Sequence, residues 1–260
     1  MLPSNLLTER PLGRSLERPD VLNFAAEPDL RARQPGREQI WAPMTTDQTD
    51  PLPSKLEPAV WLIGNAPVAQ DRSRAIDGAE VVVRFNNAFG FGGVTGTRTT
   101  HLFLINCGGQ AREWLGNSQL TEGAAVRGAD DILLPIHPAK DDLYRPPLTE
   151  AERHEPDAVN MADAMALMLR GTGKRVRILP PELFLKACRI IGYARPERGM
   201  AAPSTGLIAL LWALESFNLP IVATGFGFDG WPGHCWAAER AFFEALRDEG
   251  RLVLHPLDQG

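Results

Sequence analysis

Short apolar runs recur along the chain and alternate with segments of helical period, and this alternation constrains the fold more than any other feature. Continuous apolar runs of four to six residues fit strands that are buried on both faces, as in parallel sheets. We expect such strands at Ala59–Ile63, Glu80–Phe85, His101–Ile105, Ile132–Pro135, Val176–Leu179 and Ile221–Thr224, with Leu252–Leu254 as a last edge strand. Helices are expected at Ala158–Leu169, Glu182–Ile191, Ser204–Phe217 and Trp236–Glu249. The pattern predicts an α/β, Rossmann-like fold: a mainly parallel, twisted sheet with helices on both faces.

The chain divides into two parts by composition. Residues 1–55 are rich in proline and charge and have no sustained apolar period, so we expect a flexible N-terminal tail. Residues 56–260 carry all the expected strands and form the predicted α/β domain. Within it, Lys140–Asp157 is rich in proline and charge and is expected to be a mobile loop over the site.

Composition excludes several classes of function. The formal net charge is −5 and no basic patch is visible, which argues against a nucleic-acid partner. No apolar run approaches the roughly 20 residues of a membrane span. Three separated cysteines and five scattered histidines give neither a disulfide framework nor metal-ligand spacing, so we expect a cytoplasmic protein without a metal.

Two expected strands end in asparagine. The first ends in Gly64-Asn65 and the second in Arg84-Phe85-Asn86-Asn87. Open α/β sheets bind ligands beyond the carboxyl ends of their strands, where an amide can both donate and accept hydrogen bonds. Ordinary turn chemistry is the alternative explanation for each asparagine taken alone. Arg84 suits a buried ion pair, for which Asp77 is a candidate partner.

Two further segments carry anion-binding features. Residues 92–100 form a Gly-rich loop that includes Thr97 and Arg98, and successive backbone N–H groups in such loops can hold anions. Ser204-Thr205-Gly206 opens a Leu-rich helix, where Ser204 is a natural N-cap and the helix start offers free N–H groups. A plain flexible loop and a simple helix cap are the respective alternatives.

A histidine follows the last buried strand. Gly225 begins a Gly- and Trp-rich loop that leads to His234, and Glu239 lies in the first turn of the next helix. A histidine at a strand end and beside a helix start suits general-base catalysis, so we take His234 and, beside it, Glu239 as the candidate catalytic residues. A capping or core histidine is the alternative, and Glu239 can also serve simply to complement the helix dipole.

In order along the chain, these segments resemble the motifs of family 29 glycosyltransferases, the sialyltransferases. The large motif of that family is matched by Gly64-Asn65, Ile76-Asp77, Val82–Ala88, Gly90-Phe91 and Gly96–Thr100. Its small motif is matched by Pro203–Gly206 with the later Gly225-Phe226, and its last motif by His234 and Glu239. The segment from Gly225 to Arg240 also resembles short bacterial proteins labelled urease operon accessory protein.

The resemblance implies a GT-A-like variant of the fold and a site for a CMP-activated sugar. Asn65, Asn86 and the Ser204 helix start would hold CMP, and His234 would be the base of a metal-independent, inverting transfer to a glycan or small-molecule hydroxyl. No cofactor is implied beyond the donor substrate. The family's cysteine before Gly-Asn and its His-Tyr motif are absent here. A catalytically silent nucleotide- or sugar-phosphate-binding accessory protein is therefore the competing interpretation. A dinucleotide oxidoreductase is disfavoured because the glycine fingerprint is incomplete.

Overall fold

The computed structural model describes residues 58–117, 119–155 and 158–257. The predicted tail at residues 1–55 lies outside the described residues. The described residues carry seven strands, which are β1 (Val60–Ile63), β2 (Val81–Phe85), β3 (His101–Phe103), β4 (Asp131–Leu134), β5 (Arg175–Ile178), β6 (Ile221–Thr224) and β7 (Leu252–Leu254). Each lies within an expected strand or within one residue of it, except that β3 ends two residues earlier than predicted.

The strands form one sheet in the order β5-β4-β3-β2-β1-β6-β7, and every pairing is parallel. This confirms the predicted Rossmann-like α/β fold. The chain order changes direction at β1, which pairs with β2 on one side and β6 on the other. Such a switch point is where open parallel sheets bind ligands.

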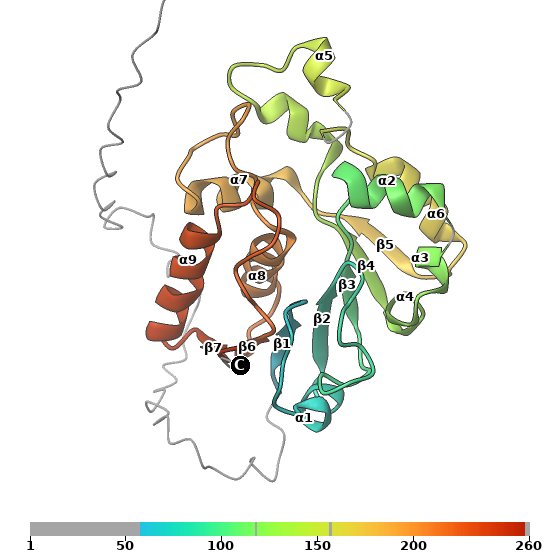
Figure 1. Cartoon of the computed structure of the whole chain (residues 1–260), viewed down its shortest axis with the longest axis vertical. Helices are drawn as coiled ribbons and strands as arrows, with labels where there is room; N and C mark the ends of the chain where they lie inside the picture. Colours follow the sequence, from blue (N-terminus) through green and yellow to red (C-terminus); the bar gives the residue numbers. More distant parts are fainter. Residues whose placement is uncertain (1–57, 118, 156–157, 258–260) are drawn as a thin grey trace, which may run out of the picture. The chain divides into compact units, whose positions relative to one another are not determined.

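Helices cover both faces of the sheet, as Figure 1 shows. One face carries α7 (Pro181–Ile190), α8 (Thr205–Ser216) and α9 (Trp236–Asp248). The other carries α1 (Ser73–Asp77), α2 (Gly108–Gly116), α4 (Ala124–Gly128) and α6 (Ala162–Arg170), with the short α3 (Gln119–Glu122) packed beside α4.

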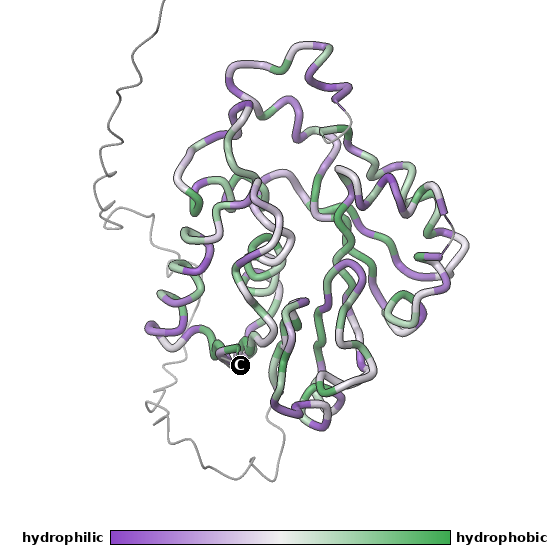
Figure 2. The backbone as a smooth tube through the Cα atoms, in the orientation of Figure 1, coloured by the Kyte–Doolittle hydropathy of each residue, from purple (hydrophilic) through white to green (hydrophobic). Residues whose placement is uncertain are grey.

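Successive side chains of each strand point to opposite faces of the sheet, so the strands contribute to a hydrophobic core on each face. In β2, Val81 and Val83 join the core under α7 and α8, whereas Val82 packs with Ile76 of α1 on the opposite face. Burial of both faces goes with largely apolar sequences in the inner strands β1, β2, β4 and β6, where Figure 2 shows much of the tube in green. The edge strand β5 instead alternates exposed arginines with half-buried Val176 and Ile178. The α8 helix is apolar on nearly every side, because α7 covers the face that turns away from the sheet.

Residues 140–155, the described part of the segment that we predicted as a mobile loop over the site, contain short helices. They include most of the 3-10 helix η2 (Pro138–Leu143) and the one-turn helix α5 (Glu150–Arg153). A capping box between Thr149 and Glu152 stabilises α5, because each side chain satisfies a backbone N–H of the other residue. The charged composition thus supports local caps rather than an unstructured loop.

Candidate functional site

Asparagines at the strand tips tie each strand end to its neighbour. The Asn65 amide donates to the carbonyl of Phe85, at the end of β2, over 3.2 Å, and its oxygen accepts from the N–H of Phe89. The oxygen of Asn86 accepts from the N–H of Ile105, just past β3, over 2.9 Å. Turn chemistry therefore explains part of each asparagine. The Nδ2 group of Asn86 has no partner among the described residues and remains available to a ligand.

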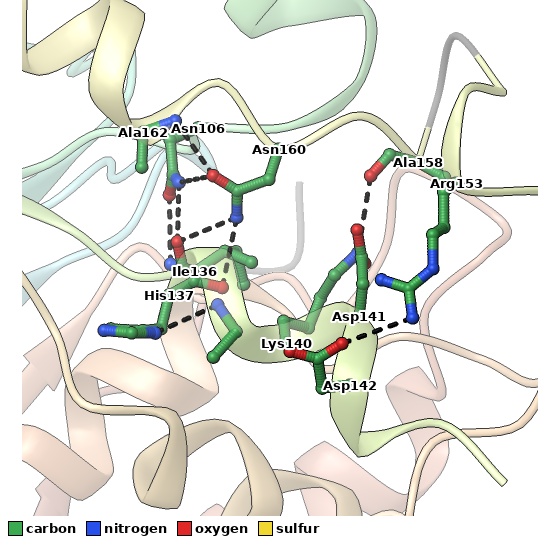
Figure 3. Close-up of polar contacts among 11 residues, drawn as sticks. Asn106, Ile136, His137, Lys140, Asp141, Asp142, Arg153, Ala158, Asn160 and Ala162 are labelled. Carbon is green, nitrogen blue, oxygen red and sulfur yellow. Dashed lines mark hydrogen bonds and ion pairs between the residues drawn. The ribbon is translucent and has the colours of Figure 1, made fainter. Parts of the chain in front are cut away.

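A third asparagine, Asn106, continues this series and was missed from the sequence. Its side chain is fully buried, donates to the carbonyl of Ile136 over 2.7 Å and accepts from the N–H of the same residue. Asn160 adds hydrogen bonds to the carbonyls of Ile136 and His137, so the ends of β3 and β4 are held in one polar cluster (Figure 3). The run Leu104-Ile105-Asn106 carries the same signal as the two asparagines that we did select.

Two glycines close the seam between β1 and β6. A Cβ on Gly64 would lie 2.0 Å from the carbonyl oxygen of Gly225, and a Cβ on Gly225 would lie 2.8 Å from that of Gly64. Gly225 also has a φ of 73°, in the left-handed region. Both glycines are therefore required by close backbone approach at the switch point.

The start of α8 offers two open backbone donors. Ser204 caps the helix, because its hydroxyl accepts from the N–H of Leu207 over 3.1 Å, as predicted. The same hydroxyl donates to the carboxylate of Glu239, so it is already used by the protein. The N–H groups of Thr205 and Gly206 have no hydrogen-bond partner among the described residues. They lie at the positive end of the helix dipole, where helices bind anions.

Glu239 is buried and bonded to Ser204. Its side chain is 1% exposed, and one carboxylate oxygen accepts from the backbone N–H of Ser204 over 2.8 Å. Burial raises the pKa of Glu239, and the hydrogen bonds from Ser204 oppose that shift. In this geometry Glu239 fixes the cap of α8, and a catalytic role for Glu239 stays a prediction.

His234 is oriented as a neutral base. It precedes α9, as predicted, and its Nδ1 lies 2.7 Å from the carbonyl oxygen of Ala202. Because a carbonyl only accepts, Nδ1 carries the proton and the lone pair resides on Nε2. Burial lowers the pKa of His234, which keeps the ring neutral near pH 7. The rings of Trp231 and Trp236 contact the imidazole edge-to-face from 4.8 and 4.7 Å.

Phe226 connects the strand tips with the α8 start. Its ring lies 5.8 Å from that of Phe85, at the end of β2, and a Cβ on Gly206 would lie 3.0 Å from its edge. The absence of a side chain at Gly206 thus makes room for Phe226. Asn65, Asn86, Thr205, Gly206 and Gly225 consequently belong to one edge of the sheet, and His234 joins it through Ala202.

The Gly-rich loop with Thr97 and Arg98 belongs to the opposite edge. It immediately precedes β3, and the Arg98 guanidinium donates to the carbonyl of Glu80, just before β2. The N–H groups of Thr97 and Arg98 donate to one carboxylate oxygen of Asp77 over 2.8 and 2.7 Å. The loop does hold an anion, but that anion is Asp77.

Arg84 supports the same loop from within the core. It is fully buried, and its guanidinium donates to the carbonyls of Thr95, Gly96 and Arg98 and to the Thr95 hydroxyl. Burial lowers its pKa to about 10, and the charge of Asp77 partly offsets this shift. Asp77 thus acts on Arg84 at a distance, and no direct ion pair between them is found.

Asn87 turns away from the other strand-tip asparagines. It is exposed on the flank of the sheet, and its oxygen accepts from the Nε1 of Trp114 over 3.3 Å.

Among the described residues, no group of histidine, cysteine and acidic side chains could hold a metal ion. None of the described helices is long and apolar enough to cross a membrane.

Comparison with known proteins gives one clear relative. The Urease operon 23 kDa accessory protein of Rhizobium meliloti (strain 1021) is 31% identical over 205 residues, which cover 76% of this chain and 93% of the relative. The chain belongs to the urease operon accessory protein family. No family model matches the chain.

Two solved structures of mammalian sialyltransferase are also similar to the chain. One, in complex with Gal-beta-1-3GalNAc-ortho-nitrophenol, has 17% identity and a TM-score of 0.46; the other has 16% and 0.47. Each match covers 77% of this chain and 70% of the solved chain.

Proposed function

We propose that this member of the family is a glycosyltransferase that moves an acidic sugar from a CMP-activated donor to an acceptor hydroxyl. The observation that carries the proposal is the pairing, at one edge of the sheet, of an imidazole with a free Nε2 lone pair and a helix start with two open N–H donors. One group can take a proton and the other can receive negative charge. The choice of CMP rests on the motif resemblance.

The proposed chemistry needs only groups of this chain and the two substrates. Nε2 of His234 removes the proton of the acceptor hydroxyl while that oxygen bonds to the anomeric carbon of the donor. The bond from that carbon to the phosphate oxygen breaks, and the electron pair leaves with CMP. The N–H groups of Thr205 and Gly206 stabilise the phosphate charge, and attack from the face opposite CMP inverts the configuration.

The strand tips supply orientation. Asn65 and Asn86 are held by the backbone of the neighbouring strands, so a free Nδ2 group on Asn86 is presented in a fixed direction. A donor nucleotide lying across β1 and β2 would meet this amide on its way to the α8 start. Pre-oriented groups of this kind reduce the entropic part of the activation barrier.

A cytoplasmic location is part of the proposal, and the three free cysteines are consistent with it.

A catalytically silent nucleotide- or sugar-phosphate-binding accessory protein is the second candidate. The position of Phe226 favours it, because its ring edge packs against Gly206 and narrows the approach to the α8 start. The relative's description as an accessory protein of the urease operon also fits this candidate. In such a protein, the same N–H donors would bind phosphate without sugar transfer.

Two measurements separate the candidates. Thermal shift with CMP, UMP, AMP and NAD tests binding, since a ligand at 100 times its Kd stabilises a fold by about 2.7 kcal/mol. We expect CMP alone to give a shift of this size. CMP release from CMP-sialic acid and from its 3-deoxy-octulosonate analogue, with a sugar acceptor mixture, tests transfer. CMP binding without release favours the silent protein, and a lack of CMP binding refutes the transferase. The silent protein is refuted in turn if no nucleotide of the panel and no sugar phosphate binds.

A further inference from the structure

A cavity lies beside the strand tips, on the face of the sheet that carries α2. It has a volume of about 530 Å³ and is bordered by residues 86–91 and by α2, α3 and the start of α4. Its larger lining side chains come from Asn86, Asn87, Phe89, Phe91, Glu113, Trp114, Asn117, Gln119 and Leu120. Asn86 borders this cavity and also belongs to the series of strand-tip asparagines.

The lining combines aromatic rings with neutral amides. Phe89 offers an exposed ring, whereas Phe91 is half-buried and Trp114 is buried in the cavity wall. The side chains of Asn87 and Gln119 can donate and accept hydrogen bonds. Glu113 supplies the only charge, and no lysine, arginine or histidine lines the cavity among the described residues. The Glu113 carboxylate would therefore repel a phosphate or carboxylate ligand, and no cation in the lining would offset that repulsion. A neutral ligand would not be repelled.

The cavity wall is held in place by specific contacts. Phe89 is 63% exposed, but its backbone N–H donates to Asn65, so the ring stands on a fixed backbone. Asn86 and Ala88 adopt left-handed φ values of 52° and 48°, which turn the chain sharply at this point. The Nε1 of Trp114 donates to the oxygen of Asn87, which leaves the Nδ2 donors of that amide for a ligand.

We propose that this cavity binds an uncharged saccharide. A sugar ring has apolar C–H faces that pack on aromatic rings, and vicinal hydroxyls that pair with amides and carboxylates through both donors and acceptors. Phe89 is the exposed ring on which such a sugar stacks, and Asn87, Gln119 and Glu113 pair with its hydroxyls. If the proposed transfer occurs, on which this last step rests, the saccharide is the acceptor, because Asn86 joins the cavity to the strand tips.

Saccharide binding can be tested without turnover. The full chain is titrated with lactose, cellobiose and maltose, and with glucose 6-phosphate as the anionic comparator, while side-chain amide signals of asparagine and glutamine are followed by NMR. We expect at least one neutral disaccharide to shift the signals of Asn87 and Gln119, and glucose 6-phosphate to bind more weakly than that disaccharide.

Variants locate the binding. Phe89→Ala should weaken disaccharide binding about tenfold, and Phe89→Trp should retain it, because the ring supplies the stacking surface. Leu167→Ala is the matched control, since Leu167 is 66% exposed on α6 outside the cavity and should have no effect. Unchanged disaccharide binding in Phe89→Ala overturns the location.

CMP titration of the same samples keeps the two proposals apart. Failure of all three disaccharides to bind a protein that still binds CMP overturns the saccharide site and leaves the nucleotide site standing. Disaccharide binding in a protein that does not bind CMP supports the cavity and refutes the transferase.

Discussion

The two edges of the sheet use the same chemistry to different ends. At the edge where strands begin, the Asp77 carboxylate accepts two backbone N–H groups of an exposed loop. At the edge where strands end, the Glu239 carboxylate accepts the N–H and the hydroxyl of Ser204 from a buried position. Asp77 thus occupies the N–H groups of Thr97 and Arg98, which could otherwise bind an anion. Glu239 anchors the cap of α8 and leaves the next two N–H groups of that helix without a partner among the described residues.

Two segments with many backbone N–H donors can thus differ in whether those donors are free to bind a ligand. The Gly-rich loop has the composition of an anion site, but the protein supplies its own anion and its own buried cation, Arg84. The α8 start has a less conspicuous sequence, yet its donors remain unused. Unsatisfied donors, rather than donor-rich composition, mark the edge that can bind a ligand.

The largest effect that we expect concerns His234. His234→Ala and His234→Asn should each lower CMP-sugar turnover about 10²–10⁴-fold, because both remove the Nε2 base. The asparagine variant can still donate to the Ala202 carbonyl, so its free energy of unfolding should stay nearer to wild type than that of the alanine variant. Turnover per folded molecule, with CMP affinity as the control, is the measurement. Full turnover in either variant would remove His234 from the mechanism.

The next effect compares the two carboxylates directly. Glu239→Ala leaves the buried N–H of Ser204 without a partner and should lower the free energy of unfolding by about 2–3 kcal/mol. Asp77→Ala should cost less than about 1 kcal/mol, because Thr97 and Arg98 are exposed and water can replace the carboxylate. Denaturant titration measures both. Equal losses would show that the two edges do not differ in burial as we describe.

A smaller effect compares one histidine at each edge. Burial, with a further contribution from Arg72, lowers the pKa of His255 to about 4, whereas at His101 the Asp131 carboxylate opposes the lowering by burial. In the unfolded chain a histidine has its ordinary pKa of about 6.5, so below that pH the unfolded state binds a proton that the folded state does not. The free energy of unfolding therefore falls as the pH falls from 6.5 to about 4. His255→Gln should remove about 1–2 kcal/mol of this loss after allowance for solvent screening, and His101→Gln should remove less. Unfolding free energies measured across this pH range test the order.

The smallest effects separate the edges by ligand binding. Asn86→Gly tolerates the left-handed backbone but lacks the amide, and should weaken CMP binding about tenfold. Arg98→Ala, at the opposite edge, should leave CMP affinity unchanged. Isothermal titration of both variants gives the comparison, and a weakened Arg98→Ala variant would contradict the placement of the nucleotide at the carboxyl edge.

The sequence predicted the sheet well because its inner strands are buried on both faces and read as apolar runs. It also predicted the helix start at Ser204, because a cap is a local interaction. The short helices α2, α3 and α4 were not predicted. Their apolar residues, such as Ala111 and Trp114, are few and lie among polar ones, so the helical period is weak over so few turns.

The site was predicted less completely, because its hydrogen bonds join residues that are distant in sequence. Glu239 meets Ser204 across 35 positions, and Thr97 meets Asp77 across 20, so neither partner could be assigned from spacing alone. Asn106 was overlooked although it ends a strand as Asn65 and Asn86 do. A search for every strand-tip amide would have found it.

The contact between Gly64 and Gly225 has a consequence for how this family can diverge. Each backbone fills the space that a methyl group on the other would need, so neither position can gain a side chain while its neighbour stays in place. Each position should therefore resist substitution by itself, because each clash is with the backbone of the other residue. In relatives that keep this seam, drift should spare both glycines together, and a lineage that has lost one should also have altered the path of the loop after β6.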